Sequence, residues 1–357
     1  MNRVITFPHM SNYYIPISYL LKKITKCKII VPPPITKKTL ELGSNNSPEY
    51  VCVPFKYNLG NFIESLDMGA NTIIQAGGGC RYGYYGELQE QILKDMNYEF
   101  EFINLIKNNH ISIIKLYKYS KKLNKKLNIM SYIYYCINTI LIMIIMDKFD
   151  NYKRKNKGFE TEKGSYKNVE TNLLKELLNE DLSIIKIIKI YIKYKKIYKK
   201  IKINKNKNNL KIGIIGELYS LMEPFSNNNI ENKLLNKKIE IERLTTLSYL
   251  LLKKKFVIKK HIKKSKKYMK YNLGADASTN IYQAIKFAKK NYDGIIHIKS
   301  FGCTPEINAI PILKKISKIY NIPILYLSVD SQDNEVAIDT RIEAFYDMIL
   351  QKNNKGD

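Results

Sequence analysis

The sequence predicts an α/β protein with two parallel-sheet domains and a helical insert between them. Short apolar runs typical of buried strands alternate with amphipathic stretches over residues 1–110, and the same alternation returns over 210–357. Residues 111–209 are rich in lysine and lack this alternation. Strands that alternate with helices form parallel βαβ units, so each end of the chain is expected to fold as a Rossmann-like domain.

Prolines and glycines limit the elements expected in the first domain. Val4–Phe7 is expected to be a strand because its apolar run ends at Pro8, and Cys27–Val31 is a second strand that stops at three prolines. Thr72–Gln75 is a third strand, and the glycines after it form a turn. The expected helices are Tyr14–Lys23, Leu59–Met68 and Glu87–Met96.

The lysine-rich middle contains two expected helices. Tyr132–Met146 is apolar, but Asn138 interrupts it and it is shorter than the roughly 20 residues that cross a bilayer, so we expect a buried helix and no membrane span. Ile184–Asn209 has apolar residues at helical spacing between lysines. A membrane-surface or RNA-binding helix has this pattern, but a solvated amphipathic helix packed on a domain is favoured.

In the second domain, buried strands again end in turn residues. Lys211–Ile215 ends at a glycine, and Gly294–Ile298 leads into the turn Ser300–Cys303. Ile322–Val329 closes on Asp330. The remaining expected elements are the strand Ile239–Glu242 and the helices Ile281–Lys290, Ile307–Ile319 and Arg341–Leu350.

The charge balance is strongly basic, and the positive charge comes mostly from lysine. The 357 residues carry a formal net charge of +28, and arginine occurs at only five positions. Nucleic-acid-binding proteins commonly use arginine for bidentate contacts with phosphate and guanine. Because arginine is scarce here, a nucleic-acid function is disfavoured. Because lysine is by far the more common basic residue in this chain, Arg81 and Arg341 are expected where the planar guanidinium group and its several N–H donors are needed. Arg341 is expected to pair with Glu343.

The five cysteines lack the close spacing of a disulfide scaffold or a structural zinc site. Near the start of the sequence, Pro8 stands where a signal peptide would have a continuous apolar run, so no signal peptide is expected. The protein is therefore expected in the reducing cytoplasm. Cys136, in the apolar helix, and Cys27 are expected to be structural.

Three cysteines lie in turn-like sequence: Cys52 in Val-Cys-Val-Pro, Cys80 after three glycines, and Cys303 in Gly-Cys-Thr-Pro. Each follows an apolar run, so a site between the two domains, at the ends of their strands, could collect all three sulfurs. Thiolates are soft ligands, and three separated cysteines suit a [4Fe–4S] cluster with one iron open to a small ligand. Loop cysteines without a metal are the alternative. The glycine run, which ends at Gly79, either approaches a phosphate or brings backbone amides to the cluster.

Seven short motifs occur together in the order found in one family. They are Pro-His-Met-Ser-Asn-Tyr at 8–13, Cys-Val-Pro-Phe-Lys-Tyr-Asn-Leu-Gly at 52–60, Gly-Gly-Cys-Arg-Tyr-Gly-Tyr-Tyr-Gly at 78–86, Gly-Glu-Leu-Tyr at 216–219, Asp-Gly-Ile-Ile-His-Ile at 293–298, Phe-Gly-Cys-Thr-Pro-Glu at 301–306 and Thr-Arg-Ile-Glu-Ala-Phe at 340–345. Over 1–105 and 210–350 the chain resembles the 2-hydroxyacyl-CoA dehydratase component family, and within it the stand-alone branch related to the acyl-CoA dehydratase activases. The resemblance is weak across the lysine-rich middle.

The resemblance implies Rossmann-like subdomains and a [4Fe–4S] cluster held by Cys52, Cys80 and Cys303. Gly79 and Arg81 would lie beside the cluster, although an ion pair to a carboxylate is an equal role for Arg81. In characterised relatives, an ATP-dependent activase supplies one electron, which the cluster passes to a 2-hydroxyacyl-CoA thioester so that a ketyl radical expels hydroxide. The expected partners are such an activase, an acyl-CoA, and a homologous second subunit or a second copy, in an anaerobic cytoplasm.

Three departures from the family pattern leave the reaction and the catalytic residues unknown. The segment expected to be rich in glycine and histidine is Asn-Leu-Gly-Ala-Asp-Ala-Ser-Thr at 272–279. Asp-Ser-Gln-Asp-Asn at 330–334 replaces an Asp-Glu pair followed by Thr and Gly, and Lys299 replaces a common proline. A non-catalytic electron-relay or accessory subunit, paired with a homologous chain, is the alternative function.

Four other polar residues lie where site residues are expected. His9 is expected to be a hydrogen-bonded turn residue and His297 a core residue. Glu217 and Glu306 each follow a strand, where a carboxylate either takes part in acid–base chemistry or caps a helix. Capping is expected for Glu306, because helix N-termini favour negative charge.

Overall fold

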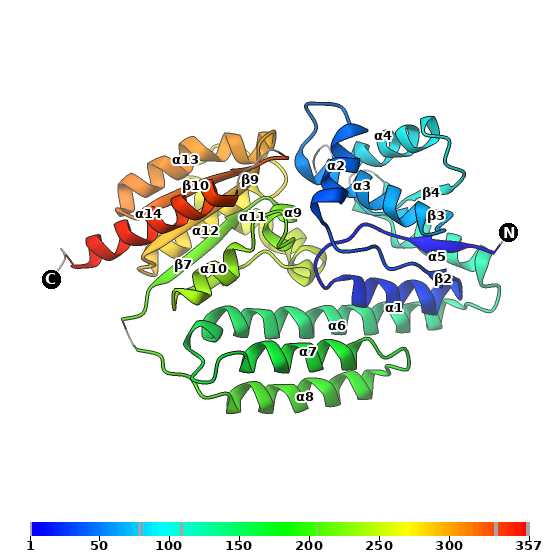
Figure 1. The fold of residues 1–357 in the computed structure, drawn as a ribbon, viewed down its shortest axis with the longest axis horizontal. Coiled ribbons are helices and arrows are strands. Elements are labelled where there is room, and N and C mark those ends of the chain that lie inside the picture. Colours follow the sequence, from blue (N-terminus) through cyan, green and yellow to red (C-terminus); the bar gives the residue numbers. More distant parts are fainter. Residues whose placement is uncertain are drawn as a thin grey trace. The chain divides into compact units, whose positions relative to one another are not determined.

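Two four-stranded sheets, each with its strands parallel, organise the chain (Figure 1). This confirms the predicted α/β class with two Rossmann-like parallel-sheet domains. The protein is described by a computed structural model that covers residues 2–77, 80, 82–107, 110–206, 208–331 and 335–354.

The chain contacts divide the protein into two units, which are described separately. Unit 1 comprises Met1–Val51, Phe55–Lys148 and Gly164–Ile201, and unit 2 comprises Cys52–Pro54, Phe149–Lys163 and Lys202–Asp357. Most of the lysine-rich middle is thus grouped with the first sheet. The separate three-part division at 1–110, 111–209 and 210–357 stays a prediction.

The sheet of unit 1 has the strand order β2-β1-β3-β4. Its strands are β1 (Val4–Thr6), β2 (Lys28–Ile29), β3 (Thr72–Gln75) and β4 (Glu101–Asn104). Every residue of β3 is buried, because a central parallel strand is covered by helices on both faces. A small antiparallel pair, β5 (Ile106–Lys107) and β6 (His110–Ile111), follows the sheet.

Five helices accompany this sheet: α1 (Tyr14–Thr25), α2 (Lys37–Asn45), α3 (Val53–Asp67), α4 (Tyr82–Asp95) and α5 (Ile113–Leu123). One apolar core joins strand and helix residues from distant parts of the sequence. Ile5 of β1 and Ile24 of α1 are fully buried there, together with Leu116 of α5 and Tyr132 from the next helix. The segment after residue 110 therefore completes the first core.

The lysine-rich middle forms three longer helices, α6 (Ile129–Asn156), α7 (Ser165–Leu177) and α8 (Ile184–Lys200), with the 3₁₀ turn η1 (Lys157–Phe159) after α6 (Figure 1). The expected apolar helix lies within α6, which continues ten residues past Met146. The second expected helix is α8, which ends at Lys200 and not at Asn209. Ser183 starts α8, since its hydroxyl accepts from the Lys186 backbone N–H.

Helix α6, taken together with η1, is long and apolar enough to cross a membrane, by length and composition alone. Core helices of soluble proteins meet the same criteria. Two buried polar side chains of α6 have partners in or next to α1: Asn138 donates to the hydroxyl of Tyr19, and Asp147 accepts from Tyr13, which precedes α1. Such contacts are typical of a helix packed inside a protein.

The sheet of unit 2 has the order β10-β9-β7-β8, formed by β7 (Lys211–Gly216), β8 (Glu240–Arg243), β9 (Gly294–Ser300) and β10 (Ile324–Val329). Its helices are α9 (Leu218–Met222), α10 (Ile230–Asn236), α11 (Lys254–Ser265), α12 (Ala277–Lys289), α13 (Thr304–Tyr320) and α14 (Glu335–Asn354), and a π-helical turn, η2 (Tyr249–Lys253), precedes α11.

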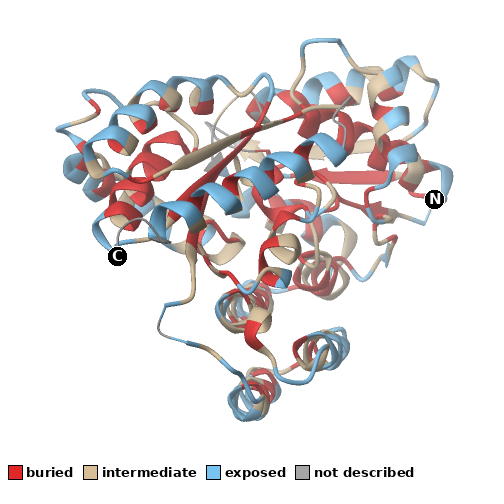
Figure 2. Ribbon diagram, turned by 60° about the vertical axis from the view of Figure 1, so that its left-hand side comes forward, coloured by how far each residue is buried: buried red, intermediate tan, exposed pale blue. Residues whose placement is uncertain are grey.

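Alternate residues of the second sheet face different helices, as the pleat of a strand requires. Ile295 of β9 packs in one cluster with residues of α12 and α13. A side-chain atom added at its neighbour Gly294 would instead meet Phe345 and Ile349 of α14. Helices therefore cover both faces of β9, and all seven of its residues are buried (Figure 2).

Several helices begin earlier than the sequence predicts. The helix expected at Leu59 begins at Val53, because Pro54 is tolerated in the first turn of a helix, where its missing N–H has no partner to lose. The helices expected at Glu87 and Arg341 begin at Tyr82 and Glu335. The polar or lysine-rich helices α2, α5, α7, α10 and α11 were not predicted.

His261 makes the stability of unit 2 depend on pH. It is buried on α11, stacked on Tyr282 of α12, and burial together with Lys260, Lys264 and Lys286 lowers its pKa from 6.5 to about 4. The unfolded chain therefore binds this proton more readily, so stability present above pH 6.5 is lost as the pH falls toward 4.

We expect the free energy of opening in α12 to fall by about 2 kcal/mol between pH 7 and pH 5 from this residue. Hydrogen exchange of α12 peptides, compared with His261→Phe, measures it. The variant keeps the stacked ring without the proton and should lose less stability over this range. Equal losses in both proteins would contradict the assignment.

Candidate functional site

The three candidate cysteines share one local setting, the start of a helix. Cys52 directly precedes α3, Cys80 lies two residues before α4, and Cys303 is the residue that caps α13. The carbonyls of Cys80 and Cys303 accept the first helical bonds, from the N–H groups of Gly83 and Ile307. Helix N-termini favour thiolate over thiol, so all three positions suit a metal-binding cysteine.

The cysteines are distributed over both units. Cys52 and Cys303 are grouped with unit 2 and Cys80 with unit 1. Within either unit, the described residues contain no group of three or more His, Cys, Asp or Glu side chains that could hold a metal ion. The gathering of the three sulfurs thus stays a prediction. Gly79 and Arg81, expected beside them, lie outside the described residues.

The other two cysteines have structural settings, as predicted. Cys136 lies on α6, where burial raises the pKa of its thiol. Cys27 precedes β2, and its thiol lies 3.6 Å from the carbonyl oxygen of Thr25.

His9 is buried, and its backbone N–H donates to Asn61.

Strands β7 and β9 end side by side in unit 2, and β9 leads into the Cys303 turn. Gly216, the last residue of β7, has φ +150°, and a Cβ there would lie 1.8 Å from the carbonyl oxygen of Ile298. Glycine is required at this close approach. The next N–H, of Glu217, donates to the same carbonyl. On the neighbouring strand, the N–H of Cys303 donates to the carbonyl of Ser300 and closes a tight turn.

Glu217 is the helix-capping carboxylate at this edge. It accepts from the backbone N–H groups of Tyr219 and Ser220, at 2.8 and 3.0 Å, and from the Ser220 hydroxyl. Burial raises the pKa of Glu217, although these hydrogen bonds act to lower it. The expectation that Glu306 caps its helix is wrong, because its side chain is used elsewhere.

Glu306 belongs to a buried polar network beneath the Cys303 turn. Its Oε2 lies 2.7 Å from His297 Nε2, and its Oε1 accepts from Asn280 Nδ2 at 2.9 Å. Asn280 also donates to the carbonyl of Gly216. All three side chains are at most 1% exposed, so the network ties the ends of β7 and β9 to α12 and α13. The sequence placed His297 in the core correctly but did not reveal its partner.

Lys299 adds a buried cation beside Cys303. It is 6% exposed, and its ammonium donates to the carbonyl of Phe301 at 3.2 Å. Burial lowers the pKa of Lys299, while the nearby Cys303 and Glu306 act to raise it. A positive charge here favours the thiolate form of Cys303.

The altered segment at 272–279 forms a turn bonded to itself. The Ser278 hydroxyl donates to Asn272 and accepts from the N–H of Leu273. Asp276 pairs with Lys254 at 2.6 Å. These polar groups are occupied within unit 2. Of the altered segment at 330–334, the last three residues lie outside the described part of the chain.

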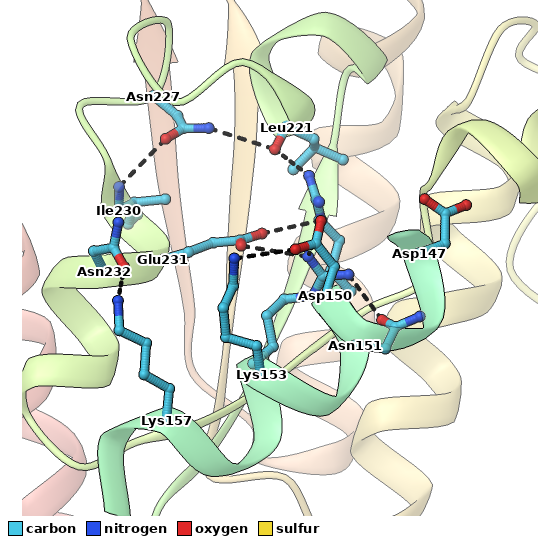
Figure 3. A network of polar contacts seen from close by, with 12 residues as sticks. Asp147, Asp150, Asn151, Lys153, Lys157, Leu221, Asn227, Ile230, Glu231 and Asn232 are labelled. Carbon is cyan, nitrogen blue, oxygen red and sulfur yellow. Dashed lines mark hydrogen bonds and ion pairs between the residues drawn. The ribbon is translucent and has the colours of Figure 1, made fainter. Parts of the chain in front are cut away.

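Two buried arginines of unit 2, Arg154 and Arg243, were not singled out by the sequence. Arg154, at the end of α6, and Arg243, at the end of β8, are buried, and both pair with Glu231 of α10. Figure 3 shows Glu231 within this polar network. Arg243 also donates to the carbonyl of Leu221. The planar guanidinium holds its donors in a fixed fork, so it can bind two acceptors in a set geometry. The scarcity of arginine was a signal that applied equally to these positions.

Arg341 does not form the expected pair with Glu343. It donates to the carbonyl of Tyr326 at 2.6 Å, and Glu343 pairs with Lys237, which follows α10. Both residues therefore have structural roles in fastening α14, although with partners other than those predicted.

A family comparison matches the part of unit 2 that carries these features. Residues 265–349, which include β9, Cys303, α13 and β10, match the family model described as 2-hydroxyglutaryl-CoA dehydratase, D-component. The match confirms the resemblance to the 2-hydroxyacyl-CoA dehydratase component family. Over these residues the protein is dehydratase-component-like, and the family that it resembles includes iron–sulfur proteins. Cys52 and Cys80 lie outside the matched residues, and no curated protein matches the chain.

The buried network supports a test of how the Cys303 turn is held. Glu306→Ala strands two buried donors, at a cost of about 1–3 kcal/mol each. Glu306→Gln should cost less, since the amide keeps one acceptor and its NH₂ can donate to His297 after a change of tautomer. Urea titration followed by circular dichroism measures both. An alanine variant as stable as the glutamine variant would contradict this role.

Proposed function

We propose that this protein is an iron–sulfur component of the 2-hydroxyacyl-CoA dehydratase type, with Cys52, Cys80 and Cys303 as ligands of a [4Fe–4S] cluster. The observation that carries the proposal is the family match across Cys303, at the end of a parallel strand and the start of a helix. The same position of Cys52 and Cys80 at helix starts supports extending it to all three.

The residues present fit such a cluster in their chemistry. Three half-buried thiols in the positive field of helix N-termini supply soft, negatively charged ligands. Three ligands leave one iron open. Gly79 and Arg81, next to Cys80 in the sequence, are proposed to contribute backbone amides and positive charge.

When bound, the cluster supplies one-electron transfer and a Lewis-acidic iron for an acyl-CoA oxygen. The protein's own residues keep its surroundings fixed. The Glu306 network anchors the two strand ends, and the Ser300–Cys303 turn sets the backbone of one ligand. Lys299 keeps a positive charge near that ligand, which favours its thiolate.

The proposed electron donor is an ATP-dependent activase, and the proposed substrate is a 2-hydroxyacyl-CoA or a related acyl-CoA, in an anaerobic cytoplasm. A second candidate function is a non-catalytic electron-relay or accessory subunit, paired with a homologous chain or a second copy. The self-bonded turn at 272–279 favours it, because the family's glycine- and histidine-rich segment is replaced there by groups already occupied.

Protein purified without oxygen is expected to hold about four irons and four sulfides per chain. Ser substitution of Cys52, Cys80 or Cys303 should remove most of the iron and the EPR signal of the reduced cluster. Cys27→Ser and Cys136→Ser are matched controls that should keep both. Iron-free protein that is folded, or equal loss in the controls, would overturn the cluster assignment.

The catalytic assignment has a separate test. With an ATP-dependent activase, ATP and a panel of 2-hydroxyacyl-CoA thioesters, we expect formation of the 2-enoyl-CoA product, measured by chromatography, and more than a hundredfold less with Cys80→Ser. Turnover without any homologous subunit would exclude the accessory role. An intact cluster with no turnover on any thioester would instead favour the accessory subunit.

A further inference from the structure

Helix α8 has an unusual composition for a surface helix. Its 17 residues contain seven lysines and no acidic residue. Four of its side chains are buried, at the helical spacing that forms one face: Ile187, Ile190, Tyr194 and Tyr198. This face packs on α7, where Tyr198 contacts the ring of Tyr166 and Tyr194 donates to Glu176. The packing of α8 in unit 1 is thereby accounted for.

The opposite face of α8 is apolar at its centre. Ile185, Ile188 and Ile192 are 67%, 47% and 48% exposed, and their spacing of three and four places them on one stripe. A helix packed on a domain normally presents its most polar residues there. Within unit 1, Figure 1 shows α8 beside α7.

Lysines flank this apolar stripe. Lys189 and Lys196 lie on one side and Lys195 on the other, and Lys199 and Lys200 continue the charge toward the end of the helix. In the described part of the chain no carboxylate pairs with these five lysines, whereas Lys193 pairs with Glu176. The outer face therefore combines exposed apolar carbon with uncompensated positive charge.

We infer that the outer face of α8 binds the surface of an anionic phospholipid bilayer. Apolar side chains at the centre of a face with lysines on both flanks are the arrangement of helices that lie in the membrane interface. The isoleucines would enter the acyl boundary while the lysine stems extend to the headgroups. Charge complementarity selects an anionic surface. RNA is less suited, because its phosphates and bases offer no partner for three central isoleucines.

The absence of tryptophan in this chain allows a direct reporter. Ile188→Trp places one indole on the stripe, and its emission should shift to the blue when the full-length protein meets vesicles of phosphatidylcholine with phosphatidylglycerol. Vesicles of phosphatidylcholine alone should give no shift. Phe256→Trp, at an exposed apolar position of α11, is the control and should not shift.

Cosedimentation with the same vesicles measures separately how much the exposed isoleucines and the flanking lysines contribute to vesicle binding. Replacing Ile185, Ile188 and Ile192 together by Ser should abolish binding, and replacing Lys189, Lys196, Lys199 and Lys200 by Gln should reduce it at least tenfold, since each lysine contributes roughly fivefold near an anionic surface. The matched control replaces Lys255, Lys259 and Lys263 of α11 and Lys266, which follows it, by Gln and should reduce binding by much less.

Three results would overturn the inference. One is no binding to anionic vesicles by the wild-type protein. Another is equal loss in the α8 and α11 lysine variants, which would make net charge sufficient. The last is RNA binding or self-association that depends on α8 without vesicle binding, which would assign the face to that partner. Unchanged circular dichroism checks that each variant is folded.

Discussion

Parallel strand pairing is the constraint on which the candidate site depends. A parallel strand cannot turn back directly to its neighbour, so the chain leaves its carboxyl end and enters a helix. Cys80 follows β3 in this way and Cys303 follows β9. Each cysteine is placed at a strand exit and a helix start by the topology itself. The setting that favours a thiolate is therefore a consequence of the fold.

Unit 2 contains buried polar side chains near the ends of β7 and β9. Glu306, His297 and Asn280 are fully buried, which costs free energy unless their hydrogen bonds are satisfied. The bonds among them satisfy both oxygens of the carboxylate, yet His297 Nδ1 and the Ser300 hydroxyl have no partner in the described part of the chain. An apolar core would avoid this cost. Retaining polar groups at a strand edge is typical of a functional region.

The sequence predicted what depends on local pattern and missed what depends on packing. Continuous apolar runs bounded by Gly and Pro located the central strands, such as β3 and β9, because both faces of these strands are covered. Helices such as α2 and α5 were missed, since they contain few apolar residues among lysines and polar residues, although the buried ones lie on one face. The capping role expected for Glu306 was wrong, because nothing local to Glu306 indicates that His297 lies within reach.

The composition of the chain accounts for the large number of lysines, but it does not explain where they lie in the structure. In unit 2, Lys205, Lys233, Lys237, Lys254 and Lys286 each pair with a carboxylate. On α8 most lysines have no such partner and surround exposed isoleucines. Repulsion among unpaired lysines on a helix is unfavourable by a few tenths of a kcal/mol per neighbouring pair. A face that keeps both this repulsion and exposed apolar surface is best explained by a ligand that relieves both, and an anionic lipid surface does so.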